Sequence, residues 1–151
     1  AIDMMNDLGG SSTVMGYSDI YTALQSGVID GAENNITALR DHGEVSKYYS
    51  FDEHTRIPDV VVISSSVWDK LNDEQKSVVE EAAENMKEKY KTSWDEFEKQ
   101  VESDVKEKYN VEFIKDVDKE AFQKAVQPMY DKLKKESPEV YELVEKVQET
   151  K

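Results

Sequence analysis

The sequence predicts an α/β protein in which short strands precede long helices. Residues 60–64 form a nearly continuous run of β-branched side chains, which is typical of a strand buried on both faces. Between residues 73 and 108, apolar side chains recur every three or four positions, as they do on one face of a helix. Charged residues are sparse up to Ser66 (10 acidic, 3 basic) and dense from Val67 onward (23 acidic, 16 basic). We therefore expect an α/β region followed by long helices with solvated outer faces.

The first part of the chain is expected to contain three short helices. Residues 1–8 match the end of a helix, which Gly9 terminates because glycine readily adopts a positive φ. A second helix is predicted from Ser18, a suitable N-cap, because apolar residues follow it at helical spacing. A third is predicted over Glu33–Arg40, with an acid and two amides in its first turn.

Three further short segments have the composition of strands. They are Thr13–Gly16, Tyr48–Phe51 and Val111–Ile114. With the run at residues 60–64, they are expected to be strands of a mixed sheet.

The second part of the chain is expected to be helical. Asn72 or Asp73 caps a helix that continues to Lys108 and would be about 54 Å long at about 1.5 Å per residue. Asp118 caps the next helix, which Pro128 should kink because proline removes one backbone donor. Ser137 then precedes a proline at the first position of a last helix, where a missing N–H costs little.

Composition excludes several function classes. The net charge of −14 disfavours binding to nucleic acid or to an anionic membrane surface. The chain has no cysteine, so disulfides, thiolate catalysis and zinc–thiolate sites are excluded. No run approaches the roughly 18 apolar residues of a membrane-spanning helix. Because the chain begins with alanine rather than methionine, we expect a processed protein or a piece of one.

The most informative stretch runs from Tyr17 to Asn35. A helical pattern stops at Gly27, an apolar pair and a glycine turn follow, and Glu33, Asn34 and Asn35 then stand in a row. Amide groups donate and accept hydrogen bonds and a carboxylate accepts them, so together they suit a small ligand with hydroxyls and a carboxylate. The alternative is a helix N-cap that binds no ligand, since such caps are common.

Other candidate residues also have two interpretations. His54 could be a structural histidine or a ligand contact, and Tyr17 could be a core aromatic or could stack on a sugar ring. A triad can be assembled on paper from Ser64, His54 and Asp52, but no nucleophile elbow surrounds any serine, so no enzyme is predicted. Metal binding and cofactors are not expected either, because no ligand spacing is present.

The run from Met15 to Asn34 resembles the signature of solute-binding proteins of TRAP transporters, the DctP type. The common form of that signature is close to M-A-F-x-E-x-Y-x-A-L-Q-x-G-x-V-D-G-x-E-N. In this chain it reads Met-Gly-Tyr-Ser-Asp-Ile-Tyr-Thr-Ala-Leu-Gln-Ser-Gly-Val-Ile-Asp-Gly-Ala-Glu-Asn. The resemblance continues over further segments, namely Glu44–Tyr49, His54, Val67–Leu71, Gln75–Ala83 and Phe122–Tyr130.

This resemblance implies a periplasmic-binding-protein-like fold and an extracytoplasmic receptor. Such a receptor captures an organic acid between two lobes and delivers it to a membrane permease driven by a sodium gradient. By motif position, Asn34 is similar to an asparagine that bonds the ligand, and Glu33 and His54 match positions that bind ligand hydroxyls or ordered water. Tyr17 replaces an aromatic residue that lines the cleft. The implied location is the periplasm or the outer face of the cell membrane.

Two departures from the family pattern refine this expectation. The family chain is about twice as long, and its carboxylate-binding arginine lies upstream of this chain; neither Arg40 nor Arg56 occupies that position. The chain therefore resembles the C-terminal half of a receptor, with ligand-lobe elements over 1–59 and an inter-lobe strand and packing helices over 60–151. The N-terminal half is then an implied partner.

The second departure concerns the residue that follows the signature. Asn35 stands where a proline is usual, so the Asn34–Asn35 pair resembles a subgroup that takes hexuronates such as glucuronate or galacturonate. A second amide suits the hydroxyls of a sugar acid. The alternative function is a non-catalytic, acidic helical module that binds other proteins.

Overall fold

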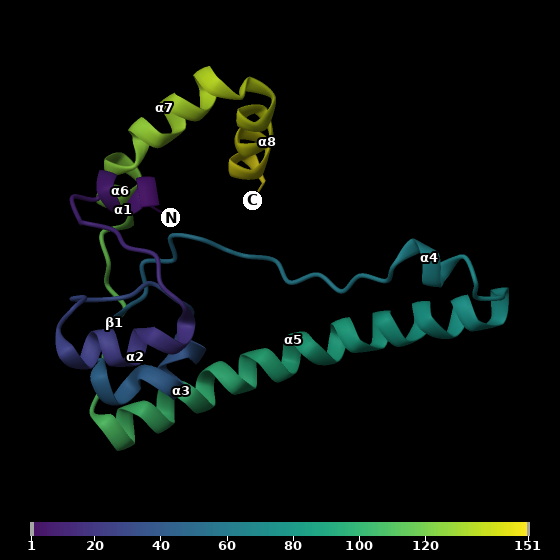
Figure 1. Ribbon diagram of the computed structural model, residues 1–151, viewed down its shortest axis with the longest axis horizontal. Helices are drawn as coiled ribbons and strands as arrows, with labels where there is room; N and C mark the ends of the chain where they lie inside the picture. Colours follow the sequence, from purple (N-terminus) through teal and green to yellow (C-terminus); the bar gives the residue numbers. More distant parts are fainter. Residues whose placement is uncertain (1, 151) are drawn as a thin grey trace. The chain divides into compact units, whose positions relative to one another are not determined.

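The computed structural model describes residues 2–150 (Figure 1). The chain divides into two compact units, which are described separately. Unit 1 contains residues 2–20, 50–54 and 114–150, and unit 2 contains residues 21–49 and 55–113.

Unit 2 is built around one end of a long helix. The short helices η1 (Ile36–Ala38), α3 (Leu39–His42) and η2 (Gly43–Val45) pack against the C-terminal part of α5 (Asp73–Tyr109), as Figure 1 shows. Most of α2 (Tyr17–Ser26) also belongs to this unit. The buried apolar side chains are Ala23, Ile36, Ala38, Leu39, Val101, Val105 and Val111.

The long helix is confirmed, and its ends have the expected local chemistry. The side chain of Asn72 accepts a hydrogen bond from the backbone N–H of Gln75 (2.9 Å), and the Gln75 side chain accepts one from the N–H of Asn72 (3.0 Å). This reciprocal capping box satisfies two donors that a helix start leaves unpaired. At the other end, Asn110 adopts the left-handed conformation (φ 61°), which asparagine tolerates well. Between these two ends, helix α5 is 37 residues long.

The apolar stripe along α5 is buried at one end only, which corrects the expectation of one buried face. Val101 and Val105 are each 3% exposed, whereas Met86 and Tyr90 are 45% and 46% exposed. Trp94 is half-buried and stacks on Tyr90 with ring centroids 5.7 Å apart. The reason is that η1, α3 and η2 cover only the last turns of the helix.

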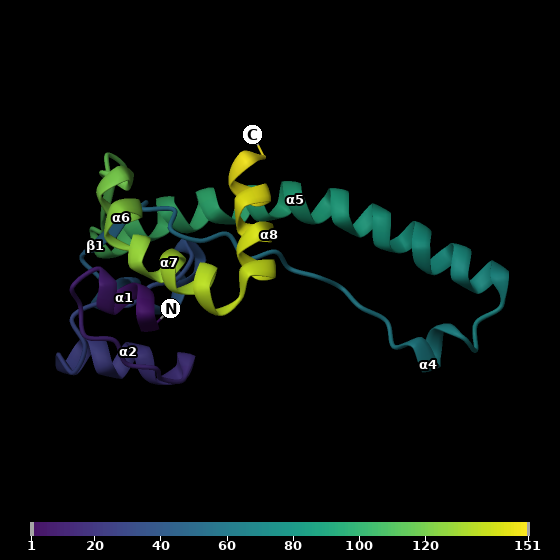
Figure 2. The same ribbon diagram turned by 90° about the horizontal axis from the view of Figure 1, so that it is seen from above.

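The predicted strand at residues 60–64 is wrong for this structure. Val60, Val61, Val62 and Ile63 are 76%, 76%, 83% and 45% exposed, and no strand is assigned there. Among the described residues, no backbone hydrogen bond outside the helices and strands involves residues 52–63. A strand forms only where a second strand satisfies its backbone groups. Figure 2 shows this extended segment leading to α4 (Ser65–Trp68).

Two of the predicted strands are confirmed. Strands β1 (Tyr48–Ser50) and β2 (Glu112–Ile114) form a two-stranded sheet. The N–H of Glu112 donates to the carbonyl of Lys47, and the N–H of Phe51 donates to the carbonyl of Ile114, both at 2.9 Å. The paired residues advance in the same direction, so the strands are parallel.

The third short segment does not form a strand. Residues 13–16 lie in a loop before α2, which begins at Tyr17 rather than after Ser18. The described part of the chain provides no neighbouring strand for this segment, so composition alone did not decide its conformation.

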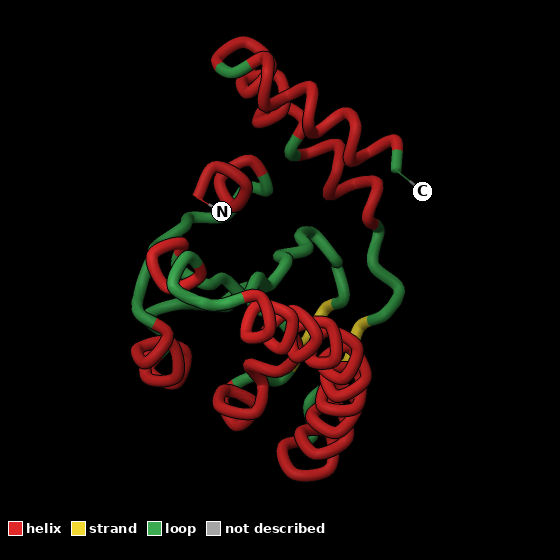
Figure 3. The backbone as a smooth tube through the Cα atoms, turned by 90° about the vertical axis from the view of Figure 1, so that its right-hand side faces the viewer, coloured by secondary structure: helices red, strands yellow, loops and turns green. Residues whose placement is uncertain are grey.

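Unit 1 is mainly helical. It contains α1 (Ile2–Asp7), α6 (Lys119–Ala125), α7 (Gln127–Glu136) and α8 (Pro138–Glu149). Helices α7 and α8 pack against each other as a hairpin (Figure 3), and α1 packs on α7.

Capping residues and prolines in the sequence predicted where the helices of this unit begin. The Asp118 side chain caps α6 by accepting a hydrogen bond from the N–H of Ala121 (3.0 Å). The kink expected at Pro128 is instead a break at Val126, so that α6 and α7 are separate helices and the proline lies in the first turn of α7. Ser137 holds the N-cap position of α8, with Pro138 as its first residue. Within residues 2–150, no helix is both long and apolar enough to cross a membrane.

Candidate functional site

A cavity of about 380 Å³ lies within unit 2, beside the predicted amide residues. Asn34 and Asn35 are part of its lining, with Leu39 and His42 on the α3 side. The strand segment that contains Tyr49 also lines it. Its volume lies in the range of small-ligand pockets, and its mixture of apolar and amide groups is typical of them.

The acid-and-amide corner precedes a helix rather than lying in its first turn. Helix η1 begins at Ile36, and Asn35 holds the N-cap position with extended backbone (φ −68°, ψ 159°). The Asn35 side chain makes no capping hydrogen bond; its Oδ1 accepts from the Thr37 hydroxyl (2.8 Å). The interpretation of this corner as an ordinary side-chain N-cap is therefore not supported.

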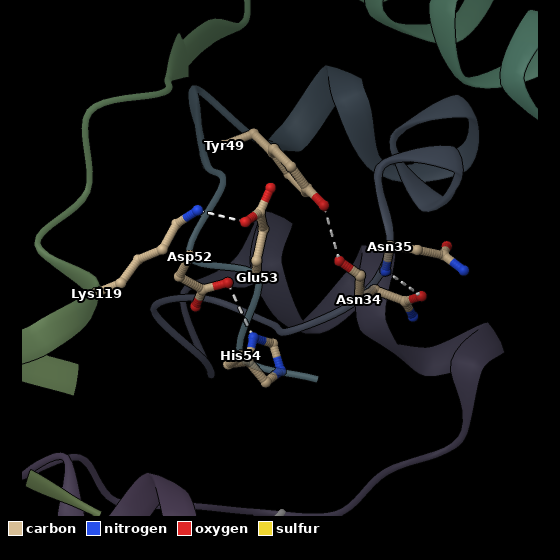
Figure 4. Close-up of polar contacts among 7 residues, drawn as sticks. All are labelled: Asn34, Asn35, Tyr49, Asp52, Glu53, His54 and Lys119. Carbon is tan, nitrogen blue, oxygen red and sulfur yellow. Dashed lines mark hydrogen bonds and ion pairs between the residues drawn. The ribbon is translucent and has the colours of Figure 1, made fainter. Parts of the chain in front are cut away.

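Asn34 is held by hydrogen bonds through its oxygens. Its side-chain Oδ1 accepts from the N–H of Asn35 (2.9 Å), and its backbone carbonyl accepts from the Tyr49 hydroxyl (3.1 Å), as Figure 4 shows. The side-chain amide nitrogen of Asn34 takes part in neither bond. These two bonds fix the backbone at the corner, and neither of them uses the amide donor of the Asn34 side chain.

Tyr49 is a site residue that the sequence reasoning did not single out. Its ring packs edge-on against Phe113, with centroids 6.1 Å apart, and its hydroxyl reaches Asn34 fifteen positions earlier. The available signal was its place in the Glu44–Tyr49 segment, but a tyrosine in a short strand gives no indication of what its hydroxyl contacts.

The structure brings only some of the predicted site residues together. Asn34 and Asn35 share the cavity of unit 2, whereas Glu33 is exposed and does not belong to its lining. Tyr17 and His54 belong to unit 1. Tyr17 is the first residue of α2 and is 48% exposed, so it is not the core aromatic that one interpretation allowed.

His54 has a defined partner in unit 1. Its Nδ1 lies 2.9 Å from Oδ1 of Asp52, and their side chains are 17% and 29% exposed (Figure 4). Between them, Glu53 adopts a left-handed conformation (φ 51°) that costs a residue with a side chain about 1–2 kcal/mol. Glu53 also forms an ion pair with Lys119, the first residue of α6. No sequence signal predicted that last contact, which spans 66 positions.

The three residues of the triad considered above belong to different units. Asp52 and His54 meet, but Ser64 belongs to unit 2 and its hydroxyl is hydrogen-bonded to that of Ser66 (2.9 Å). The described residues contain no cluster of three histidine, cysteine or acidic side chains that could hold a metal ion.

Solved structures that share this fold are periplasmic receptors. The chain superposes with a TM-score of 0.92 and 33% identity on a TRAP periplasmic solute-binding protein of Chromohalobacter salexigens with bound D-glucuronate. It superposes with a TM-score of 0.86 and 34% identity on one from Sulfitobacter with bound β-D-galacturonate. These matches cover 99% and 95% of this chain. The class that the fold defines is thus the TRAP periplasmic solute-binding protein.

Sequence comparison identifies the family. Residues 1–137 match the DctP family, the bacterial extracellular solute-binding proteins of family 7, and the chain belongs to this family. An uncharacterized protein of Salmonella typhimurium, YiiZ, is 46% identical over the whole chain. The resemblance inferred from Met15–Asn34 and the extracytoplasmic class that it implied are therefore confirmed.

The chain spans about half the length of the proteins that it matches. It covers 46% of the Salmonella protein and 50% and 48% of the two solved receptors. The expectation that the chain corresponds to about half of a receptor agrees with these values.

Proposed function

We propose that this chain is part of the extracytoplasmic solute-binding subunit of a TRAP transporter and that its ligand is a hexuronate such as glucuronate or galacturonate. The observation that carries the proposal is the amide-lined cavity on a fold whose solved relatives contain those two sugar acids. The protein would bind and release its ligand without chemical change and deliver it to the membrane permease subunits of the transporter.

In this proposal the amide groups recognise the ligand. The side-chain nitrogen of Asn34 donates to a carboxylate or hydroxyl oxygen, and Asn35 adds a second amide for the ring hydroxyls. His54 contributes a hydrogen bond, Glu33 accepts from a hydroxyl or an ordered water, and Tyr17 offers an aromatic face to the sugar ring. No cofactor is required for this binding.

We further propose that the chain is the C-terminal half of the receptor. Residues 1–59 would then supply ligand-lobe elements, and residues 60–151 an extended inter-lobe segment and packing helices. The exposed apolar run Val60–Ile63 and the exposed stripe of α5 support this, because a monomeric protein rarely leaves such surfaces uncovered. The intact mass of the natural protein tests this part directly.

The binding proposal is tested by calorimetric titration of the whole receptor with uronates and dicarboxylates. The decisive variant is Asn34→Asp, which keeps an oxygen to accept from the N–H of Asn35 but loses the amide donor and adds a negative charge. We expect uronate affinity to fall at least tenfold, the equivalent of one lost hydrogen bond of about 1.4 kcal/mol.

The matched control is Asn6→Asp in α1, which makes the same change in charge. The Asn6 side chain likewise accepts a hydrogen bond through its oxygen, from Ser12 (3.2 Å), and lies outside the cavity lining. Equal affinities of the Asn34 and Asn6 variants would refute the role of Asn34. A whole receptor that binds no organic acid at all would favour the alternative of a protein-interaction module.

A further inference from the structure

The extended segment before α4 is uncovered in both its side chains and its backbone (Figure 2). All four residues of the run Val60–Ile63 are exposed. Within the described part of the chain, none of them makes a backbone hydrogen bond. β-Branched residues favour extended backbone, so this run has the conformation of a strand without the neighbours that a strand requires.

Both faces of the run are apolar. In an extended segment successive side chains point to opposite faces, so Val60 and Val62 point one way and Val61 and Ile63 the other. A strand with one solvated face alternates apolar and polar residues, whereas a strand buried on both faces is apolar throughout. The run therefore has the composition of a central strand, with other strands at both of its edges and packing on both of its faces.

The run begins beside an uncovered part of α5. The Tyr90 hydroxyl donates a hydrogen bond to the carboxylate of Asp59 (3.1 Å), the residue that directly precedes Val60. Tyr90 and its neighbour Met86 belong to the exposed part of the apolar stripe of α5. All these residues lie in unit 2, so one compact unit presents both an unpaired strand and an uncovered helix face.

The solved receptors indicate what covers this surface. The receptors with bound D-glucuronate and β-D-galacturonate match 99% and 95% of this chain, but the chain covers only 50% and 48% of them. About half of each receptor therefore has no counterpart in this chain. That half is long enough to supply further strands, and an exposed strand edge binds another strand through its backbone groups.

We propose that the N-terminal half of the receptor supplies a β-strand that hydrogen-bonds to the backbone of residues 60–63, so that the two halves share one sheet. This inference rests on the part of the proposed function that makes the chain the C-terminal half of a receptor. It does not depend on which acid the receptor binds. Its consequence is that the N–H groups of residues 60–63 stabilise the whole receptor but contribute nothing to the stability of this chain alone.

Amide hydrogen exchange measures this pairing directly. In the whole receptor, the N–H groups of residues 60–63 should exchange at least about 100-fold more slowly than in the 151-residue chain, because a paired N–H exchanges only when the sheet opens. In the chain alone they should exchange as in an unstructured peptide. Residues 101–105 of α5 are the internal control and should be protected in both proteins, since Val101 and Val105 are buried.

A proline substitution tests the role of the backbone separately. Val62→Pro removes one N–H and keeps an apolar side chain, and proline is tolerated in an extended segment that has no partner. It should lower the urea midpoint of the whole receptor and leave that of the 151-residue chain unchanged. The matched control is Val62→Thr, which keeps the N–H and the β-branch and should retain the slow exchange of residues 60–63 in the receptor.

Each outcome decides a different point. Free exchange of residues 60–63 in the whole receptor overturns the shared sheet, as does an equal effect of Val62→Pro on receptor and chain. Protection that appears in the 151-residue chain alone and rises with its concentration assigns the pairing to a second copy of the chain, and also overturns it. A receptor that protects these residues but binds no uronate refutes the proposed ligand and leaves the shared sheet intact. A natural protein with the mass of these 151 residues alone refutes the half-receptor proposal, and the shared sheet with it.

Discussion

Gly43 is the position where a single added methyl group should disturb the scaffold of the site most. It directly follows α3 as the first residue of η2, where the backbone passes close to α5. A Cβ atom at Gly43 would lie 3.0 Å from Cδ2 of Tyr109 and 3.2 Å from Cγ1 of Val105. Carbon atoms pack best at about 3.5–4.0 Å, so Gly43→Ala requires α3 or α5 to shift.

The expected cost follows from which atoms could move. Val105 is 3% exposed and sits in the small core of unit 2, so its side chain cannot turn away. The Tyr109 atom belongs to a rigid ring rather than to the end of a flexible chain. Overpacking of this kind costs about 1–3 kcal/mol. Because η1, α3 and η2 provide much of the packing on α5, we expect a loss of about 2 kcal/mol of unfolding free energy.

Urea denaturation followed by far-ultraviolet circular dichroism measures this loss. The matched control is Gly31→Ala, where an added Cβ meets nothing within 4 Å and the backbone φ is not positive. That variant should change stability by less than about 0.5 kcal/mol or raise it slightly, because alanine reduces the freedom of the unfolded chain. If both variants unfold at the same urea concentration, the close approach of α3 to α5 is not as described.

Three further predictions concern the same unit. Val101→Ala should lower the unfolding free energy in urea by about 2 kcal/mol, because it leaves a cavity at a buried position. Val78→Ala, at a residue of the same helix that is 61% exposed, should lower it by less than about 0.5 kcal/mol. Equal losses would contradict a core confined to one end of α5. Tyr49→Phe removes one hydroxyl donor and should cost about 0.5–1.5 kcal/mol in the same assay, so no measurable loss would argue against that hydrogen bond. Tyr21 donates a hydrogen bond to the Glu44 carboxylate (3.1 Å), and this bond raises the pKa of Tyr21. The bond therefore stabilises the folded state below about pH 10, and this stabilisation is lost as the phenol ionises at higher pH. Glu44→Gln should lower the Tyr21 midpoint in a ¹³C NMR titration, and an unchanged midpoint would exclude that cause.

The features that the sequence predicted correctly depend on interactions between residues close together in the chain. The capping of α5 by Asn72, the capping of α6 by Asp118 and the break near Pro128 involve groups within four positions of each other. Such contacts depend on residue type and spacing, and the amino-acid sequence gives both directly. The family signature at Met15–Asn34 belongs to the same category, because it is a pattern along the chain.

The features that the sequence predicted wrongly depend on a second segment of the chain. The Val60–Ile63 run has the composition of a buried strand, but composition supplies no partner for its backbone groups. The apolar stripe of α5 likewise predicted a buried face without showing how much of it other helices would cover. The contacts of Tyr49 and Lys119 were missed for the same reason, since each joins positions far apart in the chain.

The sequence by itself determined the family, most of the helices, the caps of α5 and α6, and the amide residues that we assign to the ligand. These follow from short-range chemistry and from a linear motif. Only the tertiary structure decided that Asn34 and Asn35 border a cavity, that Tyr49 secures their backbone and that Asp52 faces His54 across a left-handed residue. The physical reason is that a cavity and a long-range hydrogen bond exist only once distant segments have packed.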